Sequence, residues 1–220
     1  NRDANINNYV TFANTKKQIL WLRKWRGWTW RIILNCLQSF ACHKASYSFS
    51  SLMARIFIAI RFNDEFKKAL VSIQDALKAR GVSGNYCPYD NLHMTLVFIG
   101  ERYDLQKIGK ALSEVEFKPF TLTLDRLGSF PTKAGVIWCG TKENEPATTI
   151  ANLLRERLTA HGVSFSTKAF YPHISLVRHP SQIVTDIDVP AASIKIERVF
   201  VMKSERIDGE LVYSEMTATE

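Results

Sequence analysis

The stretch that decides the fold reads NLHMTLVFIG and runs from Asn91 to Gly100. Its residues favour an extended strand, in which successive side chains point to opposite faces. His93 and Thr95 are two residues apart and therefore share one face. The stretch predicts a β-strand that presents an imidazole and a hydroxyl on the same side.

A second stretch repeats this order eighty residues later. It reads YPHISLVR from Tyr171 to Arg178, so His173 and Ser175 correspond to His93 and Thr95. The segments upstream of the two histidines also match, as ARGVS and AHGVS. In both, the glycine follows a helix-like segment and suits the left-handed residue at a helix end. The chain therefore reads as two copies of one unit.

Strand, helix and motif strand recur in both copies. The first set is expected at residues 55–62, 64–80 and 92–99, and the second at 135–141, 147–161 and 172–177. The segment Gly128–Pro131 suggests a turn, and Asp208–Gly209 predicts a hairpin between two closing strands. We expect an α+β fold with two pseudo-symmetric lobes of antiparallel sheet and flanking helices, and an active-site cleft lined by the histidines between them.

Two imidazoles on related strands suit chemistry at phosphorus, because one group must take a proton and another must give one. Imidazole serves both roles near neutral pH. The hydroxyls of Thr95 and Ser175 are suited to donating hydrogen bonds to phosphate oxygens. A metal site is a poorer interpretation, because two imidazoles lack further ligands at usable spacing. Phe57, on the strand expected beside the first motif, suggests a core residue or a surface on which a base stacks.

The positive charge of the chain is concentrated at one end. Residues 1–52 hold eight Lys or Arg against one Asp, whereas residues 53–220 hold 21 basic and 20 acidic residues. The part that carries the motifs is nearly neutral, so we expect it to engage a phosphate locally instead of wrapping a long duplex. The four cysteines lack CxxC spacing, which fits reduced thiols in a cytoplasmic protein. No apolar run is long enough to span a membrane.

Residues 1–52 differ in kind from the rest. They hold four of the five tryptophans, partly at helical spacing among basic residues, which fits an amphipathic membrane-surface helix or a nucleic-acid arm. We favour a different interpretation, in which this segment is a non-native, disordered or loosely helical extension. The first methionine is Met53, directly before the first convincing strand. We expect one bilobal domain at residues 53–220, active as a monomer.

The two motifs resemble the HxT/S pair of the 2H phosphoesterases, most closely the bacterial RNA 2',3'-cyclic phosphodiesterase group, called LigT-like. The resemblance runs from Ala54 to Ser214 and includes GVIW at 135–138 and SERIDG at 204–209. It implies a hydrolase without metal or cofactor that opens a terminal 2',3'-cyclic phosphate on RNA to leave a 2'-phosphate. The resemblance to this group also implies the reverse reaction, ligation through a 2'-5' bond.

The resemblance implies a role for each motif residue. His93 would be the proton donor to the leaving 3' oxygen, and His173 the proton acceptor that activates water. Thr95 and Ser175 would hold the phosphate, with Arg178 as a charged contact. Serine at position 175 departs from the more frequent threonine but keeps the hydroxyl. Three alternatives remain open: hydrolysis of small cyclic nucleotides, hydrolysis of 2'-5' oligonucleotides, and binding of RNA ends without turnover.

Overall fold

The computed structural model describes residues 54–101, 103–130, 135–142 and 144–219. The expectations for residues 1–52 and for a start at Met53 lie outside this range. In the part of the chain that is described, no helix has the length and apolar character needed to cross a membrane.

The first sheet carries the first motif. It has four antiparallel strands in the order β3-β1-β8-β9. Their bounds are β1 (Arg55–Arg61), β3 (His93–Gly100), β8 (Phe200–Ile207) and β9 (Glu210–Ala218). Asp208 and Gly209 join β8 to β9 with φ of 52° and 88°. Positive φ at both central residues is typical of the tight turn predicted from Asp-Gly.

The second sheet carries the second motif. It has five strands in the order β2-β6-β5-β4-β7, again antiparallel. Their bounds are β2 (Asn85–Tyr86), β4 (Phe120–Phe130), β5 (Val136–Thr141), β6 (Ile174–Arg178) and β7 (Ser193–Ile196). Strands β7 and β8 are neighbours in sequence but belong to different sheets, β7 to the second and β8 to the first. The predicted α+β fold with two antiparallel sheets is confirmed.

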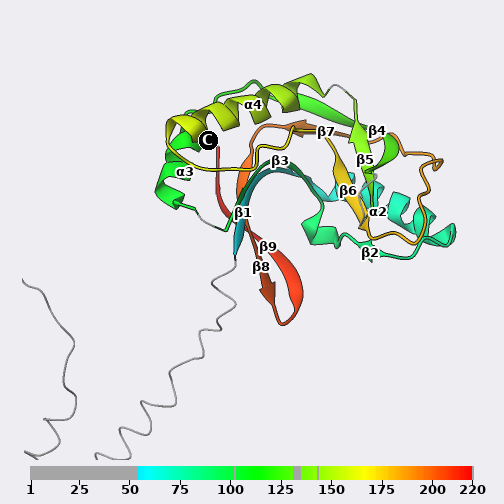
Figure 1. Ribbon diagram of the computed structural model, residues 1–220. Coiled ribbons are helices and arrows are strands. Elements are labelled where there is room, and N and C mark those ends of the chain that lie inside the picture. Colours follow the sequence, from blue (N-terminus) through cyan, green and yellow to red (C-terminus); the bar gives the residue numbers. More distant parts are fainter. Residues whose placement is uncertain (1–53, 102, 131–134, 143, 220) are drawn as a thin grey trace, which may run out of the picture. The chain divides into compact units, whose positions relative to one another are not determined.

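Two of the helices pack across the two halves of the repeat. The three longer helices are α2 (Asp64–Ala79), α3 (Leu105–Ser113) and α4 (Glu145–Ala160). Helix α2 lies between β1 and β2 in sequence and contacts β6, whereas α4 lies between β5 and β6 and contacts β3 (Figure 1). Gln74 of α2 is buried and donates from Nε2 to the carbonyl oxygens of Cys87 and Leu176. Each half of the repeat thus packs its helix on the motif strand of the other half.

One hydrophobic core underlies both sheets. The Asn63 side chain accepts a hydrogen bond from the backbone N–H of Phe66 and so caps α2. Phe66 and Leu77 are buried on the helix face that the 3.6-residue spacing predicts. Buried side chains of α2, α3 and α4 and of both sheets belong to a single cluster. The lobes therefore share their core, which fixes the two motif strands relative to each other.

The turn predicted at Gly128–Pro131 is wrong for its described residues. Strand β4 continues from Phe120 through Gly128 to Phe130. Gly128 pairs with Trp138 on β5, and a Cβ atom at position 128 would lie 2.3 Å from the indole ring. The glycine accommodates a large neighbouring ring in a sheet instead of turning the chain.

Candidate active site

Strand β3 carries a bulge directly after its motif residues. Thr95 pairs with Ala59 of β1, whereas Val97 pairs with Ile58, so Leu96 is an extra residue on β3. One extra residue reverses which side chains face each side of the sheet from that point onward. Leu96 and Val97 are accordingly buried in succession.

Strand β6 carries the same bulge eighty residues later. Ser175 pairs with Trp138 of β5, whereas Val177 pairs with Ile137, so Leu176 is the extra residue. Leu176 and Val177 are both buried. The two halves of the repeat share a break in alternation as well as a sequence motif.

The bulges bring Phe98 and Arg178 to the faces of the histidines. Strict alternation from His93 or His173 would send a side chain five residues on to the opposite face. After the bulge, Phe98 pairs with Phe57 and is 43% exposed, and Arg178 is exposed at the end of β6. A guanidinium and an aromatic ring therefore occupy equivalent positions beside the two imidazoles.

Both imidazoles are anchored in the same way. Nδ1 of His93 lies 2.7 Å from the carbonyl oxygen of Asn91, and Nδ1 of His173 lies 2.7 Å from that of Tyr171. A carbonyl oxygen only accepts, so Nδ1 carries the proton and the neutral ring keeps its lone pair on Nε2. Nε2 of His93 lies 2.9 Å from the Thr95 hydroxyl, which donates to it in this tautomer. Both Nε2 atoms are thus set to exchange protons.

The carbonyl that anchors His93 is itself held in place. Asn91 is buried, ends the short 3-10 helix Tyr89–Asn91, and donates from Nδ2 to the carbonyl oxygen of Leu211 on β9 at 2.7 Å. This bond ties the entrance of β3 to the far edge of the same sheet. Strand β9 therefore helps to orient the His93 ring.

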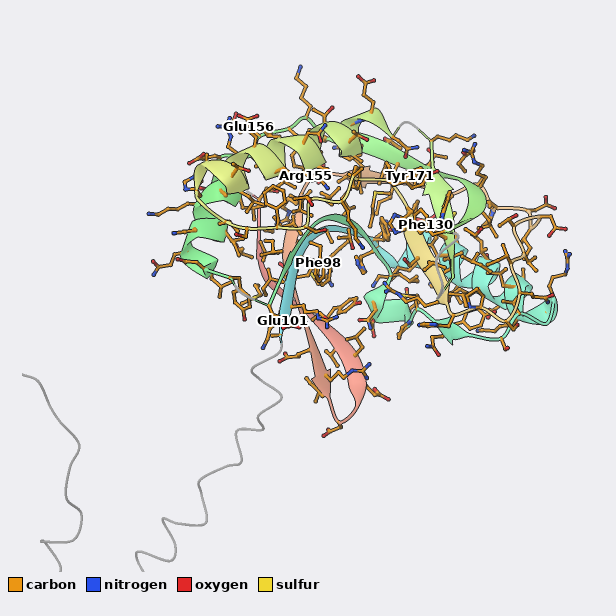
Figure 2. All side chains as sticks on the ribbon, viewed as in Figure 1. Phe98, Glu101, Phe130, Arg155, Glu156 and Tyr171 are labelled. Carbon is orange, nitrogen blue, oxygen red and sulfur yellow. The ribbon has the colours of Figure 1, made fainter. Side chains whose placement is uncertain are left out.

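Aromatic side chains surround each imidazole. The His93 ring centroid lies 5.0 Å from that of Phe57 and 5.2 Å from that of Tyr213. The centroid of the His173 ring lies 4.8 Å from that of Phe130, with Trp138 and Tyr171 close by. Figure 2 shows Phe130 and Tyr171 on the side of the second sheet and Phe98 at the first. The rings pack against the imidazoles and help to fix their orientation.

Burial and positive charge keep both imidazoles neutral. Burial lowers the pKa of His93 to about 4, against the opposing effect of the hydrogen bond to Asn91, and the charges of Arg178 and His173 lower it further. Burial also lowers the pKa of His173, and the charge of Arg178 acts in the same direction. The charge of Arg178 therefore acts on both imidazoles, and the strands of the two motifs, β3 and β6, contact each other.

A cavity of about 230 Å³ adjoins His93. It is lined mostly by residues of the first sheet, among them Phe57, His93, Thr95 and Phe98, and by Arg178 of the second sheet. Within the described ranges, the Arg178 guanidinium forms no ion pair and the Ser175 hydroxyl no hydrogen bond. The cavity thus places an unpaired cation near the neutral imidazole of His93, an arrangement that suits an anion.

The structure brings most of the predicted site residues together. His93, Thr95, Arg178 and Phe57 line the cavity. Phe57 is buried, as expected of a core residue, and stacking of a base on it stays a prediction. His173, directly before β6, and Ser175, on β6, are partly buried and are not among the residues that line this cavity. The sequence analysis missed the contribution of Phe98. The signal was available, because Phe98 stands eighty residues before Arg178 at the same place in the repeat.

Other nucleophilic or ligating groups are separate from this chemistry. The described cysteines, Cys87 and Cys139, are free thiols whose pKa burial raises to about 11 and 12. They therefore remain protonated at neutral pH. No three His, Cys, Asp or Glu residues of the described part gather as they would around a metal ion.

Comparison with known proteins agrees with this geometry. Residues 60–138 match the family model described as LigT like Phosphoesterase. An RNA 2',3'-cyclic phosphodiesterase of Thermotoga maritima is 32% identical over 163 residues, covering 68% of this chain and 86% of the relative. The corresponding protein of Archaeoglobus fulgidus is 34% identical over 140 residues, covering 60% and 78%.

Solved structures agree as well. The crystal structure of E. coli LigT in apo form superimposes with a TM-score of 0.65 and 25% identity, covering 76% of this chain and 99% of that one. The similarity to the Thermotoga protein spans nearly the whole of that relative at more than 30% identity. Sequence, fold and site geometry therefore agree that this chain belongs to the LigT-like family of 2H phosphoesterases.

Proposed function

We propose that this protein hydrolyses the 2',3'-cyclic phosphate at the end of an RNA strand to a 2'-phosphate. The observation that carries the proposal is the matched pair of imidazoles. Each is anchored through Nδ1 to the carbonyl oxygen two residues upstream, and both feel the charge of the unpaired Arg178. The names of the relatives from Thermotoga maritima and Archaeoglobus fulgidus support the substrate class.

In the proposed reaction, water attacks the phosphorus atom and the bond to the 3' oxygen breaks. His173 accepts the proton of the water at Nε2, and His93 donates a proton from Nε2 to the departing 3' oxygen. Thr95 and Ser175 donate hydrogen bonds to the non-bridging oxygens, and Arg178 offsets their negative charge. One proton enters the enzyme and one leaves it, so no other reactant is needed.

The low pKa of His93 bears on its role as donor. At pH 7 its ring is neutral in the empty cavity, because burial lowers its pKa to about 4. A bound phosphate anion favours the imidazolium and raises this pKa, so His93 acquires its proton together with the substrate. Burial and the charge of Arg178 also lower the pKa of His173, so the opposite assignment, with His173 as donor, is the second candidate.

A bridging sulfur atom distinguishes the two assignments. A cyclic substrate with sulfur at the 3' position has a leaving group that needs little protonation. This substrate should restore activity to the variant that lacks the proton donor and leave the variant that lacks the base inactive. Rescue of His93→Ala supports the first assignment, and rescue of His173→Ala supports the reverse.

The proposed activity is tested with a short RNA that ends in a 2',3'-cyclic phosphate, in the presence of EDTA. The expected product is a periodate-resistant 2'-phosphate, and EDTA should have no effect. His93→Ala and His173→Ala should each lower the rate by about 10² to 10⁴, and the double variant should be inactive. Full activity of either single variant would remove that histidine from the mechanism. RNA binding without conversion would instead indicate an RNA-end binding module.

The reverse reaction is examined in the same assay. Because proton donor and acceptor exchange roles when a reaction runs backwards, the same imidazoles would join a 5'-hydroxyl end to the cyclic phosphate through a 2'-5' bond. Added RNA with a 5'-hydroxyl should therefore yield a longer product that depends on both histidines. We propose that a monomer is active, which gel filtration alongside the assay can check.

A further inference from the structure

A second cavity adjoins the candidate active site. It has a volume of about 430 Å³ and is lined by Arg55 and Phe98, by Ile99 to Glu101 at the end of β3, and by Ser164. Arg55 and Phe98 also line the cavity that contains His93. The two cavities therefore meet at these two side chains, and a ligand that fills the first can continue into the second.

The two halves of the repeat differ in what lies beside the serine that bounds this cavity. Ser164 corresponds to Ser83, in the repeated segments AHGVS and ARGVS. The backbone N–H of Ser83 donates to the Ser181 hydroxyl at 3.0 Å, and the backbone N–H of Ser181 donates to the carbonyl oxygen of Ser83 at 2.8 Å. Both serines are exposed, but Ser83 is bonded to the segment after β6, whereas Ser164 borders the second cavity.

Phe98 offers a free stacking surface in this cavity. The ring is 43% exposed and makes no ring contact with another aromatic residue among those described. The bulge at Leu96 fixes its direction, and the carbonyl oxygen of Phe98 accepts a hydrogen bond from the backbone N–H of Ser166 at 2.8 Å. A Cβ atom at position 100 would lie 3.9 Å from the Phe98 ring, and because this residue is glycine no side chain occupies that space. A planar base can thus approach a ring that is already held in place.

Arg55 supplies positive charge at the junction of the two cavities. Its Nε donates to Glu101 at 3.2 Å, in an ion pair between two exposed side chains. The terminal Nη groups of Arg55 make no hydrogen bond to any residue in the described ranges. An exposed ion pair is weak and rearranges readily. These N–H groups are suited to a phosphodiester that passes from one cavity to the next.

We propose that this second cavity binds the nucleotide immediately 5' of the terminal one, so that the enzyme prefers oligonucleotide ends over mononucleotides. This inference rests on the proposed function. When a cyclic phosphate occupies the site of the histidines, both the 2' and 3' oxygens of the terminal ribose are engaged. The strand can then continue only from the 5' oxygen. The phosphodiester at that oxygen meets Arg55, and the next base stacks on Phe98.

The test compares a mononucleotide 2',3'-cyclic phosphate with a dinucleotide that ends in the same cyclic nucleotide. The measured quantity is the ratio of kcat/KM for the dinucleotide to kcat/KM for the mononucleotide, in which the fraction of folded enzyme cancels. Stacking of one base on an aromatic ring predicts a ratio of about 5- to 150-fold for the unaltered protein. Phe98→Ala should lower the ratio toward one, and Phe98→Tyr, which keeps the ring, should preserve it.

A second variant tests the cavity without altering Phe98. Ser164→Trp places an indole in the second cavity and should also lower the ratio toward one. Ser72→Trp, on the exposed surface of α2 and outside both cavities, is the matched control and should leave the ratio unchanged. Equal kcat/KM for both substrates, or a ratio that Phe98→Ala and Ser164→Trp leave intact, would overturn the inference alone. Turnover of neither substrate would overturn the proposed function together with it.

Discussion

Phe98 and Arg178 stand at the same position of the two repeats, and each reaches the face of its histidine because an extra leucine precedes the valine before it. The two side chains differ sharply in chemistry. A guanidinium on the second sheet suits a phosphate, and an aromatic ring on the first suits a base. The two strands have therefore diverged at the position where a substrate with both kinds of group needs different contacts.

Arg178 is predicted to supply most of the charge that binds the phosphate. Arg178→Gln should lower kcat/KM by about 10 to 100-fold, because hydrogen bonds to charged groups contribute about 1.5 to 3 kcal/mol. Arg178→Lys keeps the charge but not the planar fork, so an intermediate loss is expected. Inhibition by inorganic phosphate should weaken in the same order. If Arg178→Gln bound phosphate as tightly as the unaltered protein, the anion would have to be held elsewhere.

The pH dependence of kcat/KM should also show the effect of Arg178. Activity requires one protonated and one neutral imidazole, so the optimum lies between the two pKa values, both of which are lowered from 6.5. Rising pH removes the proton, and activity falls. Because the charge of Arg178 lowers both values, Arg178→Gln should raise them and move the falling limb to higher pH. Arg178→Lys should leave that limb in place.

NMR titration of the two imidazoles measures the effect of Arg178 on their pKa values directly. The resonances of His93 and His173 should titrate at higher pH in Arg178→Gln than in the unaltered protein. The limb of kcat should also lie at higher pH than that of kcat/KM, since the bound phosphate raises the pKa of a neighbouring imidazole. Unchanged titration of both rings would mean that burial alone sets their pKa values.

The sequence predicts which side chains provide the chemistry of this site better than it predicts how the site is shaped. The repeated motifs predict both histidine strands, because alternation is a local property and each strand keeps it from the histidine to the hydroxyl. The bulges at Leu96 and Leu176 are set by pairing with β1 and β5, so alternation alone places Phe98 and Arg178 on the wrong face. The resemblance to a known family, and not the strand pattern, identified Arg178.

Two further differences have the same physical origin. Helix α2 packs on β6 and helix α4 packs on β3, each on the motif strand of the other half. Tertiary packing decides this arrangement, because helical spacing shows only which face of a helix is apolar. A turn is expected at Gly128–Pro131, but the role of Gly128 is set by Trp138 on the neighbouring strand. Contacts between distant segments decided each point that local pattern left undetermined.

The Thr95 hydroxyl is predicted to act both on His93 and on the phosphate. It donates to Nε2 of His93 at 2.9 Å in the empty cavity and can turn to a phosphate oxygen when substrate binds. Thr95→Val keeps the shape and removes the hydroxyl, so kcat should fall by about 10² to 10³, as for loss of one donor to a developing charge. Thr95→Ser should retain most of the activity. Equal rates for Thr95→Val and the unaltered protein would restrict this residue to packing.

A shortened chain that begins at Met53 is predicted to fold and to keep its activity. The described core residues extend from Ala54 to Met202, and the residues that line the cavity of His93 run from Arg55 to Tyr213, so both lie after Met53. The urea midpoint of unfolding and kcat/KM on the cyclic-phosphate RNA should therefore match those of the full chain. A shortened chain that folds but loses RNA hydrolysis would show that residues 1–52 contribute to the substrate site.

Gly128 and Gly109 form a matched pair for testing how the second sheet supports His173. A Cβ atom at Gly128 would meet the Trp138 ring at 2.3 Å, whereas one at Gly109, in α3, would have no heavy atom within 4 Å. Trp138 is only 6% exposed and contacts Phe130 and His173, so the ring cannot move without disturbing them.

Gly128→Ala should therefore lower the free energy of unfolding by about 1 to 3 kcal/mol, the usual cost of overpacking. It should also reduce kcat/KM through the displaced indole. Gly109→Ala should raise the free energy of unfolding by about 0.5 to 1 kcal/mol, because alanine loses less conformational freedom in a helix, with no change in kcat/KM. Urea unfolding of both variants measures the difference. If Gly128→Ala were as stable and active as Gly109→Ala, the indole would have room to shift, and the His173 ring would not depend on it.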